Sequence, residues 1–212
     1  MSDVQVSEKL ISFLIFLPLF FISLAVHEFS HAFFANKFGD DTAKKLGRLT
    51  LNPIKHIDLV GSIIMPLIAF SSGYLIIGWA KPVPVNRNNF KNPLKNDLVV
   101  TAAGPASNFL LAFIFYFVLI LLNGFTPEGL HLLKKVTWLG IYFNVFLFAF
   151  NLLPIPPLDG SHILYDLFPG KLTAKYLNLG LYGTILLFIF IYSPLWGMFM
   201  SFVSFLIELF FI

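Results

Sequence analysis

The sequence predicts an all-α polytopic membrane protein with about five to six hydrophobic segments, one of them re-entrant or broken, and a short extended or β segment near the candidate site. Composition is the first reason, because 58% of the 212 residues are apolar and only 12% are charged, and the mean hydropathy is +0.83. Distribution is the second, because nearly all charged residues lie between long apolar runs. Multispan membrane proteins have this pattern, and soluble enzymes do not.

The charge balance and the absence of cysteine narrow the function classes. The net charge is +3, but no basic run exceeds two consecutive residues. Orientation in a membrane therefore explains the excess better than nucleic-acid binding does. The chain has no cysteine, which excludes a disulfide framework and thiolate chemistry. Any metal ligands must then be His, Asp or Glu.

The first hydrophobic segment has 17 uncharged residues at 10–26, and its apolar character continues to residue 35 through a short polar insertion. The region before it carries at least as many acids as bases, and no small-residue cleavage site follows it. We therefore expect a membrane helix and not a cleaved signal peptide.

The second segment, 57–78, is apolar but interrupted by glycine, serine and proline, which predicts a re-entrant or broken segment. In the polar stretch that follows, Pro82 and Pro84 alternate with valines. Each proline disfavours helix for the residue before it, so we expect a short extended or β element here.

The later segments lie at 98–122, 136–153, 172–192 and 195–212. A proline-rich stretch, NLLPIPPLDGSH, precedes the last two, which form an apolar hairpin. We find no internal repeat. The sequence predicts a single membrane domain over 1–212, with a core at 10–165 and the C-terminal hairpin at 172–212.

The polar insertion in the first segment has the spacing of a zinc site. His27 and His31 are four residues apart, so both imidazoles lie on one helical face and can bind one Zn²⁺. Glu28 follows the first histidine in an H-E-x-x-H pattern, where it can reach the water that the metal activates. An acid deep in a lipid-embedded helix costs roughly 2.5 to 3.5 kcal/mol, and zinc coordination, worth on the order of 10 kcal/mol, can offset that cost. Glu28 therefore argues against two histidines that merely pack.

A catalytic zinc site has three protein ligands, and Asp159 is the best candidate for the third. It follows the prolines of NLLPIPP, which hold the chain extended, and Gly160 permits a sharp turn after it. The alternative role for Asp159 is that of a turn or cap acid. His162, three residues further on, is expected to make a polar contact near the membrane interface.

These motifs resemble the site-2 protease family of intramembrane zinc metalloproteases. HEFSH lies in one hydrophobic segment, GPASN (104–108) in a later one, and NLLPIPPLDG follows a third. GRLTLNPIKHIDLVG together with GWAKPVPVN resembles the compact prokaryotic branch, which lacks appended domains. The resemblance covers residues 10–165.

The resemblance implies an integral membrane zinc metalloendopeptidase of a prokaryotic cell membrane that hydrolyses peptide bonds within or near transmembrane segments. It implies that His27, His31 and Asp159 bind one Zn²⁺, that Glu28 is the catalytic base and acid, and that Asn151 holds the substrate backbone or the oxyanion. The expected partners are a transmembrane protein or peptide substrate and the lipid bilayer, without nucleic acid.

Two other classes of function stay open. A membrane zinc-binding protein or transporter would also use intramembrane His and Asp, but it has no need of an acid directly after its first ligand. A catalytically inactive family member acting as a binding module would normally have lost Glu28 or a metal ligand.

Topology offers a test of this interpretation. If all six segments alternate across the bilayer, Lys and Arg divide 7 to 7, and Asp159 lies across the membrane from the two histidines. If segment 57–78 returns to the face it came from, the three polar ligands share one side and Lys and Arg divide 11 to 3. The positive-inside rule then predicts a site near the cytoplasmic face. There, GWAKPVPVN is expected to offer an edge to which an unwound substrate adds as a strand.

Overall fold

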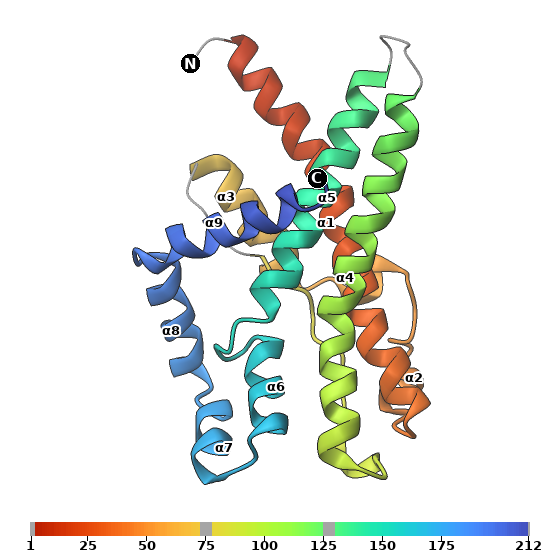
Figure 1. The fold of residues 1–212 in the computed structure, drawn as a ribbon, viewed down its shortest axis with the longest axis vertical. Coiled ribbons are helices and arrows are strands. Elements are labelled where there is room, and N and C mark those ends of the chain that lie inside the picture. The colour runs from red at the N-terminus through yellow and green to blue at the C-terminus, as the bar shows by residue number, and fades with distance from the viewer. Residues whose placement is uncertain (1–2, 73–77, 125–129, 212) are drawn as a thin grey trace.

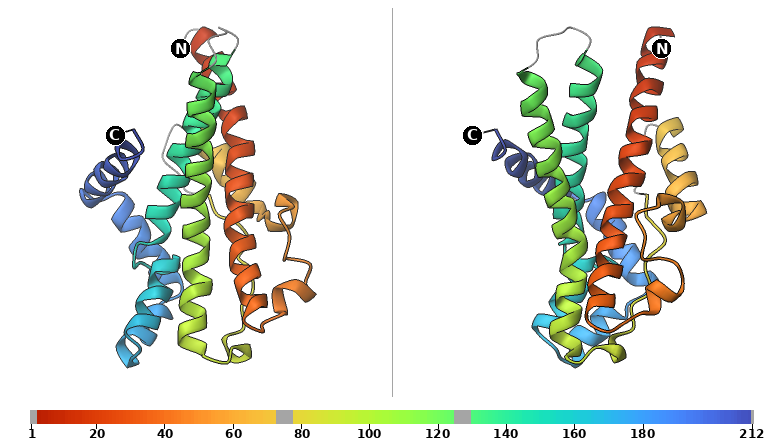
Figure 2. Two further views of the ribbon diagram at one scale, coloured as in Figure 1. Left: turned by 45° about the vertical axis from the view of Figure 1, so that its right-hand side comes forward. Right: turned by 90° about the vertical axis from the view of Figure 1, so that its right-hand side faces the viewer.

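Three long helices form the frame of the molecule (Figure 1). The computed structural model describes residues 3–72, 78–124 and 130–211. The long helices are α1 (Asp3–Lys37), α4 (Pro93–Asn123) and α5 (His131–Asn151). Each is long and apolar enough to cross a bilayer. They run side by side, and α4 packs along both of the others (Figure 2).

The ends of these helices follow local sequence signals. Pro93 opens α4 at a position where a missing N–H costs nothing. Gly124 closes the same helix, and its N–H donates to the carbonyls of Ile120 and Leu121. The end of α1, the start of α4 and the end of α5 lie toward the same end of the molecule (Figure 1). That arrangement agrees with the topology expected if segment 57–78 does not cross.

Shorter elements form the connections. Between α1 and α4 lie α2 (Thr42–Lys45), the 3-10 turn η1 (Pro53–His56), the π-helix η2 (Leu59–Ile64), α3 (Met65–Ser72) and the 3-10 turn η3 (Arg87–Asn89). After α5 come α6 (Asp159–Leu167), α7 (Lys171–Leu177), α8 (Leu181–Ile191) and α9 (Leu195–Glu208).

The predicted count of five to six segments is not confirmed. Segment 57–78 contains only the short apolar helix Leu59–Ser71 in its described part, and residues 73–77 lie outside the described residues. α7 and α8 occupy the predicted segment 172–192, but they are bent by 78° at their junction. Within the described residues, three helices are long and apolar enough to cross a membrane, or four if the bent pair is one span.

The predicted β element is not formed as a strand. The described residues contain no strand, and 79–86 run without regular secondary structure. Backbone hydrogen bonds still tie the start of this stretch to the connection before it. The Trp79 N–H donates to the Gly61 carbonyl at 3.1 Å, and the Lys81 N–H donates to the His56 carbonyl at 2.9 Å. The prolines that follow have no N–H, which prevents a regular ladder from continuing.

The apolar core lies where α4, α5, α8 and α9 meet. Ala112, Val145 and Val203 have no exposed surface there. Small residues allow the close packing of α4 against α5. A Cβ built on Gly140 would lie 2.7 Å from the Phe115 ring, so any larger side chain must push that ring aside.

Replacing Gly140 with alanine should destabilise the helix frame. We expect Gly140→Ala to lower the free energy of unfolding by about 1–3 kcal/mol, because the added methyl overpacks the contact with Phe115. Thermal unfolding in detergent measures the effect. Gly197→Ala is the matched control, since a Cβ on Gly197 meets nothing within 4 Å. An equal response of the two variants would contradict the packing argument.

Candidate metal centre

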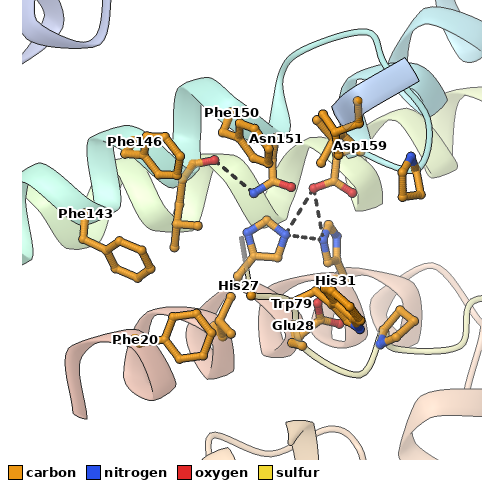
Figure 3. A pocket seen from close by; sticks show the side chains of 18 of the residues that line it. Phe20, His27, Glu28, His31, Trp79, Phe143, Phe146, Phe150, Asn151 and Asp159 are labelled. Atoms are coloured by element: carbon orange, nitrogen blue, oxygen red, sulfur yellow. Dashed lines mark hydrogen bonds and ion pairs between the residues drawn. The ribbon is translucent and has the colours of Figure 1, made fainter. Parts of the chain in front are cut away.

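Three side chains from two helices converge on one point (Figure 3). The Nε2 atoms of His27 and His31, one turn apart on α1, are 3.0 Å from each other. Asp159, the first residue of α6, places its Oδ2 at 3.1 Å from His27 Nε2 and 3.5 Å from His31 Nε2. The structure thus brings together the three predicted metal ligands. Within the described residues, they are the one group of three such side chains close enough to hold a metal ion.

Hydrogen bonds on the far side of each imidazole fix the position of its proton. Nδ1 of His31 lies 2.8 Å from the carbonyl oxygen of Val100, which can only accept. Nδ1 of His27 lies 2.6 Å from Oδ1 of Asn108. That amide presents its oxygen to His27 because its Nδ2 donates to the Ser23 carbonyl at 3.1 Å. In the neutral imidazoles both protons therefore sit on Nδ1, and both Nε2 atoms point lone pairs at the carboxylate.

Three acceptor atoms that face one another repel unless a cation lies between them. The side chains of the two histidines are only 7% and 11% exposed, so water screens little of this repulsion. Oδ2 of Asp159 is buried, and no described residue donates a hydrogen bond to it. Two imidazole nitrogens and one carboxylate oxygen match the donor set of catalytic zinc sites. The residues fit a zinc ion, which His27, His31 and Asp159 would hold.

The asparagine that orients His27 belongs to a buried polar network. Asn108 and Asn144 have no exposed surface, and the Nδ2 of Asn108 also donates to the Oδ1 of Asn144 at 3.0 Å. Asn144 in turn donates to Ser23 Oγ and to the Gly140 carbonyl, each at 2.9 Å. Sequence reasoning missed Asn144. The available signal was an amide within an apolar helix, which must find partners because leaving it unpaired in the membrane is costly.

Gly104 allows α4 to approach the two imidazoles. A Cβ built on Gly104 would lie 2.4 Å from His31 Nε2 and 2.7 Å from His27 Cε1. No other residue fits at this position without displacing a predicted ligand. The small residues of 104–108 therefore serve close helix approach beside the site, as expected from the sequence.

Close packing presents Asp159 to the histidines. Leu158 is extended, with φ −72° and ψ 156°, and α6 begins at Asp159. A Cβ built on Gly160 would lie 2.3 Å from the carbonyl oxygens of Leu152 and Leu153. Gly160 is not among the described glycines with positive φ. Glycine is thus needed here for space and not for the sharp turn that we expected.

Glu28 lies beside the three ligands but not among them. Its residue is 8% exposed, and its Oε2 accepts a hydrogen bond from the Val83 N–H at 2.7 Å. Val83 stands between Pro82 and Pro84, which have no N–H, so it supplies the single donor of that triplet. The contact ties the extended stretch to α1 and fixes one oxygen of the carboxylate.

A cavity of about 1030 Å³ extends from the metal centre between the helices. Its polar end contains the three predicted metal ligands and Glu28. Most of the remaining lining is aromatic or aliphatic, and Figure 3 shows several of these side chains pointing into it. The aromatic lining includes Phe16, Phe20, Phe143, Phe146, Phe150 and Trp196. A cavity of this size and character suits an apolar peptide.

Asn151 and His162, which the sequence singled out, line this cavity without a hydrogen bond to the three predicted ligands in the described structure. Asn151, predicted to hold substrate, donates from Nδ2 to the Leu147 carbonyl at 3.0 Å within α5. His162 accepts a hydrogen bond at Nδ1 from Arg87 at 3.1 Å. Burial, followed by the positive charge of Arg87, lowers the pKa of His162. The imidazole is therefore neutral at neutral pH.

Replacing Gly104 with alanine should disrupt the metal centre more than the fold. The added methyl displaces both imidazoles, so we expect Gly104→Ala to weaken zinc binding by about 10- to 100-fold, the usual cost of disturbing the support of a ligand. Zinc affinity measured by competition with a chelator tests this. Gly140→Ala crowds α5 against Phe115 of α4 and not α4 against the two imidazoles of α1, so it should bind zinc normally. Unchanged affinity in Gly104→Ala would refute the assignment.

Comparisons with known proteins identify a family and several relatives. A profile of peptidase family M50 matches residues 15–138 and 128–191. A Bacillus subtilis protein named "Putative zinc metalloprotease YwhC" is 46% identical over 178 residues, which cover 82% of this chain and 78% of that protein. A Mycolicibacterium smegmatis protein named "Putative zinc metalloprotease Rip2" is 35% identical over 152 residues, covering 70% and 55% of the two chains. No solved structure matches the chain. The chain belongs to peptidase family M50, the site-2 protease family of membrane zinc metalloproteases.

Proposed function

We propose that this chain hydrolyses peptide bonds within or near transmembrane segments of membrane proteins. One Zn²⁺ is held by His27, His31 and Asp159, and Glu28 acts as general base and acid. The observation that carries the proposal is the convergence of three acceptor atoms beside Glu28 at the polar end of an apolar cavity. A zinc transporter or a purely structural zinc site would not need Glu28 there.

The chemistry divides between the metal and Glu28. Zinc, when bound, would act as a Lewis acid that polarises the scissile carbonyl and lowers the pKa of the water bound to it toward about 7. Glu28 takes the proton from the attacking water and then gives it to the leaving amine. The hydrogen bond from the Val83 N–H holds one carboxylate oxygen, which leaves the other oxygen to carry the proton.

The position of the site supports an intramembrane substrate. Counted from residue 10, a rise of about 1.5 Å per residue places His27 about 26 Å along a hydrocarbon core of about 30 Å. The site then lies just inside one membrane boundary. The connections at that end carry 11 of the 14 Lys and Arg residues, which supports a site near the cytoplasmic face of a prokaryotic cell membrane.

The extended stretch after α3 supports strand addition by an unwound substrate. A peptide bond in a helix is shielded by its own hydrogen bonds, so the substrate must unwind before it is cleaved. Within the described residues the N–H groups of Ala80 and Val85 have no hydrogen-bond partner, and both residues line the cavity. A substrate strand can bind these donors and the neighbouring carbonyls. Asn151, which lines the same cavity, is in our proposal a further contact for the substrate backbone or the oxyanion.

Removing the carboxylate of Glu28 should stop cleavage without removing zinc. We expect Glu28→Gln to keep one zinc per chain and to lower kcat for transmembrane peptides by about 10²- to 10⁴-fold, the usual contribution of a general base. Metal analysis of the purified protein and peptide cleavage in detergent measure both quantities. Cleavage that survives in Glu28→Gln, or zinc-loaded wild type that cleaves no peptide in a broad panel, would defeat the proposal.

Removing the free N–H of Val85 should weaken substrate binding. A proline at this position keeps the chain extended but lacks the donor, so we expect Val85→Pro to raise KM by about 3- to 10-fold, equivalent to one hydrogen bond. Zinc content and kcat should change little. Val85→Ala is the control, because it loses the same side-chain packing and keeps the N–H. Equal KM values for the two variants would rule out strand addition at this residue.

A further inference from the structure

The Arg87 side chain connects three separate parts of the chain next to the metal centre. It is the first residue of η3, directly after the extended stretch, which ends at Asn86. Its guanidinium forms an ion pair with Asp97 in the first turns of α4. On α6, the same guanidinium lies 3.4 Å from Asp166, donates to Nδ1 of His162 at 3.1 Å, and lies 5.2 Å from the centroid of the Tyr165 ring.

These contacts join two helices whose relative position sets the geometry of the metal site. α4 orients both histidines, through the Val100 carbonyl and through Asn108. α6 carries Asp159 at its first residue. The distance between the carboxylate and the imidazoles therefore depends on how α6 sits against α4, and the contacts of Arg87 bear on both helices.

The charges at this junction need the arginine. The side chains of Asp97 and Asp166 are 5% and 0% exposed, and no described residue donates a hydrogen bond to either oxygen of Asp166. Burial and then the charge of Asp97 raise the pKa of Asp166 to about 7, and Arg87 partly opposes this rise. Without the guanidinium, Asp166 must bind a proton to stay buried beside Asp97, and the contacts that join η3 to both α4 and α6 are lost.

We propose that Arg87 is a positioning residue for the metal centre, which holds Asp159 against His27 and His31 by fastening α6 to α4. The inference rests on the proposed function, in which Asp159 is the third metal ligand. A planar guanidinium suits the task, because one rigid group can bind carboxylates on two helices, an imidazole and an aromatic face at once.

Cobalt substitution of the full-length protein in detergent tests this role directly. Co²⁺ reports its coordination through visible absorption, and zinc affinity is measured by competition. We expect Arg87→Gln to bind zinc about 10- to 100-fold more weakly than wild type and to shift the Co²⁺ spectrum toward that of Asp159→Asn. Arg87→Lys, which keeps the positive charge but not the planar guanidinium with its several N–H donors, should give an intermediate zinc affinity.

Two further variants separate positioning from general instability. Arg48 is also buried and donates to the Lys81 carbonyl at 2.6 Å, and it forms no hydrogen bond or ion pair with α6 in the part of the chain that the structure describes. Arg48→Gln should therefore leave the Co²⁺ spectrum unchanged. If Arg87→Gln does not fold, the double variant Arg87→Met with Asp97→Asn can be used. It removes the charges of Arg87 and Asp97 together and still lacks the contacts that hold α6 against α4. It should show the same loss of zinc affinity.

The outcomes distinguish this inference from the proposed function. A wild-type spectrum and affinity in Arg87→Gln, or in the neutral double variant, overturn the positioning role of Arg87. A change of equal size in Arg48→Gln also overturns it, because the effect would then reflect stability alone. An unchanged spectrum in Asp159→Asn instead overturns the assignment of Asp159 as a ligand, and with it the metal site of the proposed function.

Discussion

The structure depends on holding three electron-pair donors together at the end of a largely apolar cavity. Two imidazole nitrogens and one carboxylate oxygen face each other within 3.0 to 3.5 Å, an arrangement that is stable only around a cation. The polar contacts in the core serve this arrangement. The Val100 carbonyl and Asn108 fix the imidazole protons, and Gly104 leaves space for both rings. The candidate metal centre therefore ties α1, α4 and α6 together, and contacts from these helices in turn position its side chains.

The three side chains that meet at the candidate metal centre could be predicted from the sequence because their signals are local. His27 and His31 need only the helical period, and the prolines before Asp159 mark a stiff segment at a helix end. The Val100 carbonyl could not be predicted, because every residue has a carbonyl and only the fold selects one. Arg87 gave no signal either, since an arginine in a polar connection is usually solvated.

The three long helices could be predicted for a similar reason, since an uninterrupted apolar run must hydrogen-bond within itself in lipid. The count of spans could not. Hydropathy measures how apolar a run is and not whether its helix continues. Segment 172–192 has only one charged residue, yet α7 ends at Leu177 and α8 begins at Leu181, directly after Gly180, which has a φ of +54°. Likewise the prolines of PVPV predict extension, but they do not identify the carbonyls of Gly61 and His56 as partners of the preceding residues.

Because prolines stand on both sides of Val83, the extended stretch can donate a hydrogen bond to Glu28 in only one register. A slip of the stretch by one residue would offer Glu28 a proline nitrogen without hydrogen. A slip by two would restore a donor only after the chain had moved about 6.6 Å along its own axis. Small sliding motions of the stretch therefore cannot shift the position of the Glu28 carboxylate gradually. The chain is either in the single register that holds Glu28 or it releases Glu28 completely.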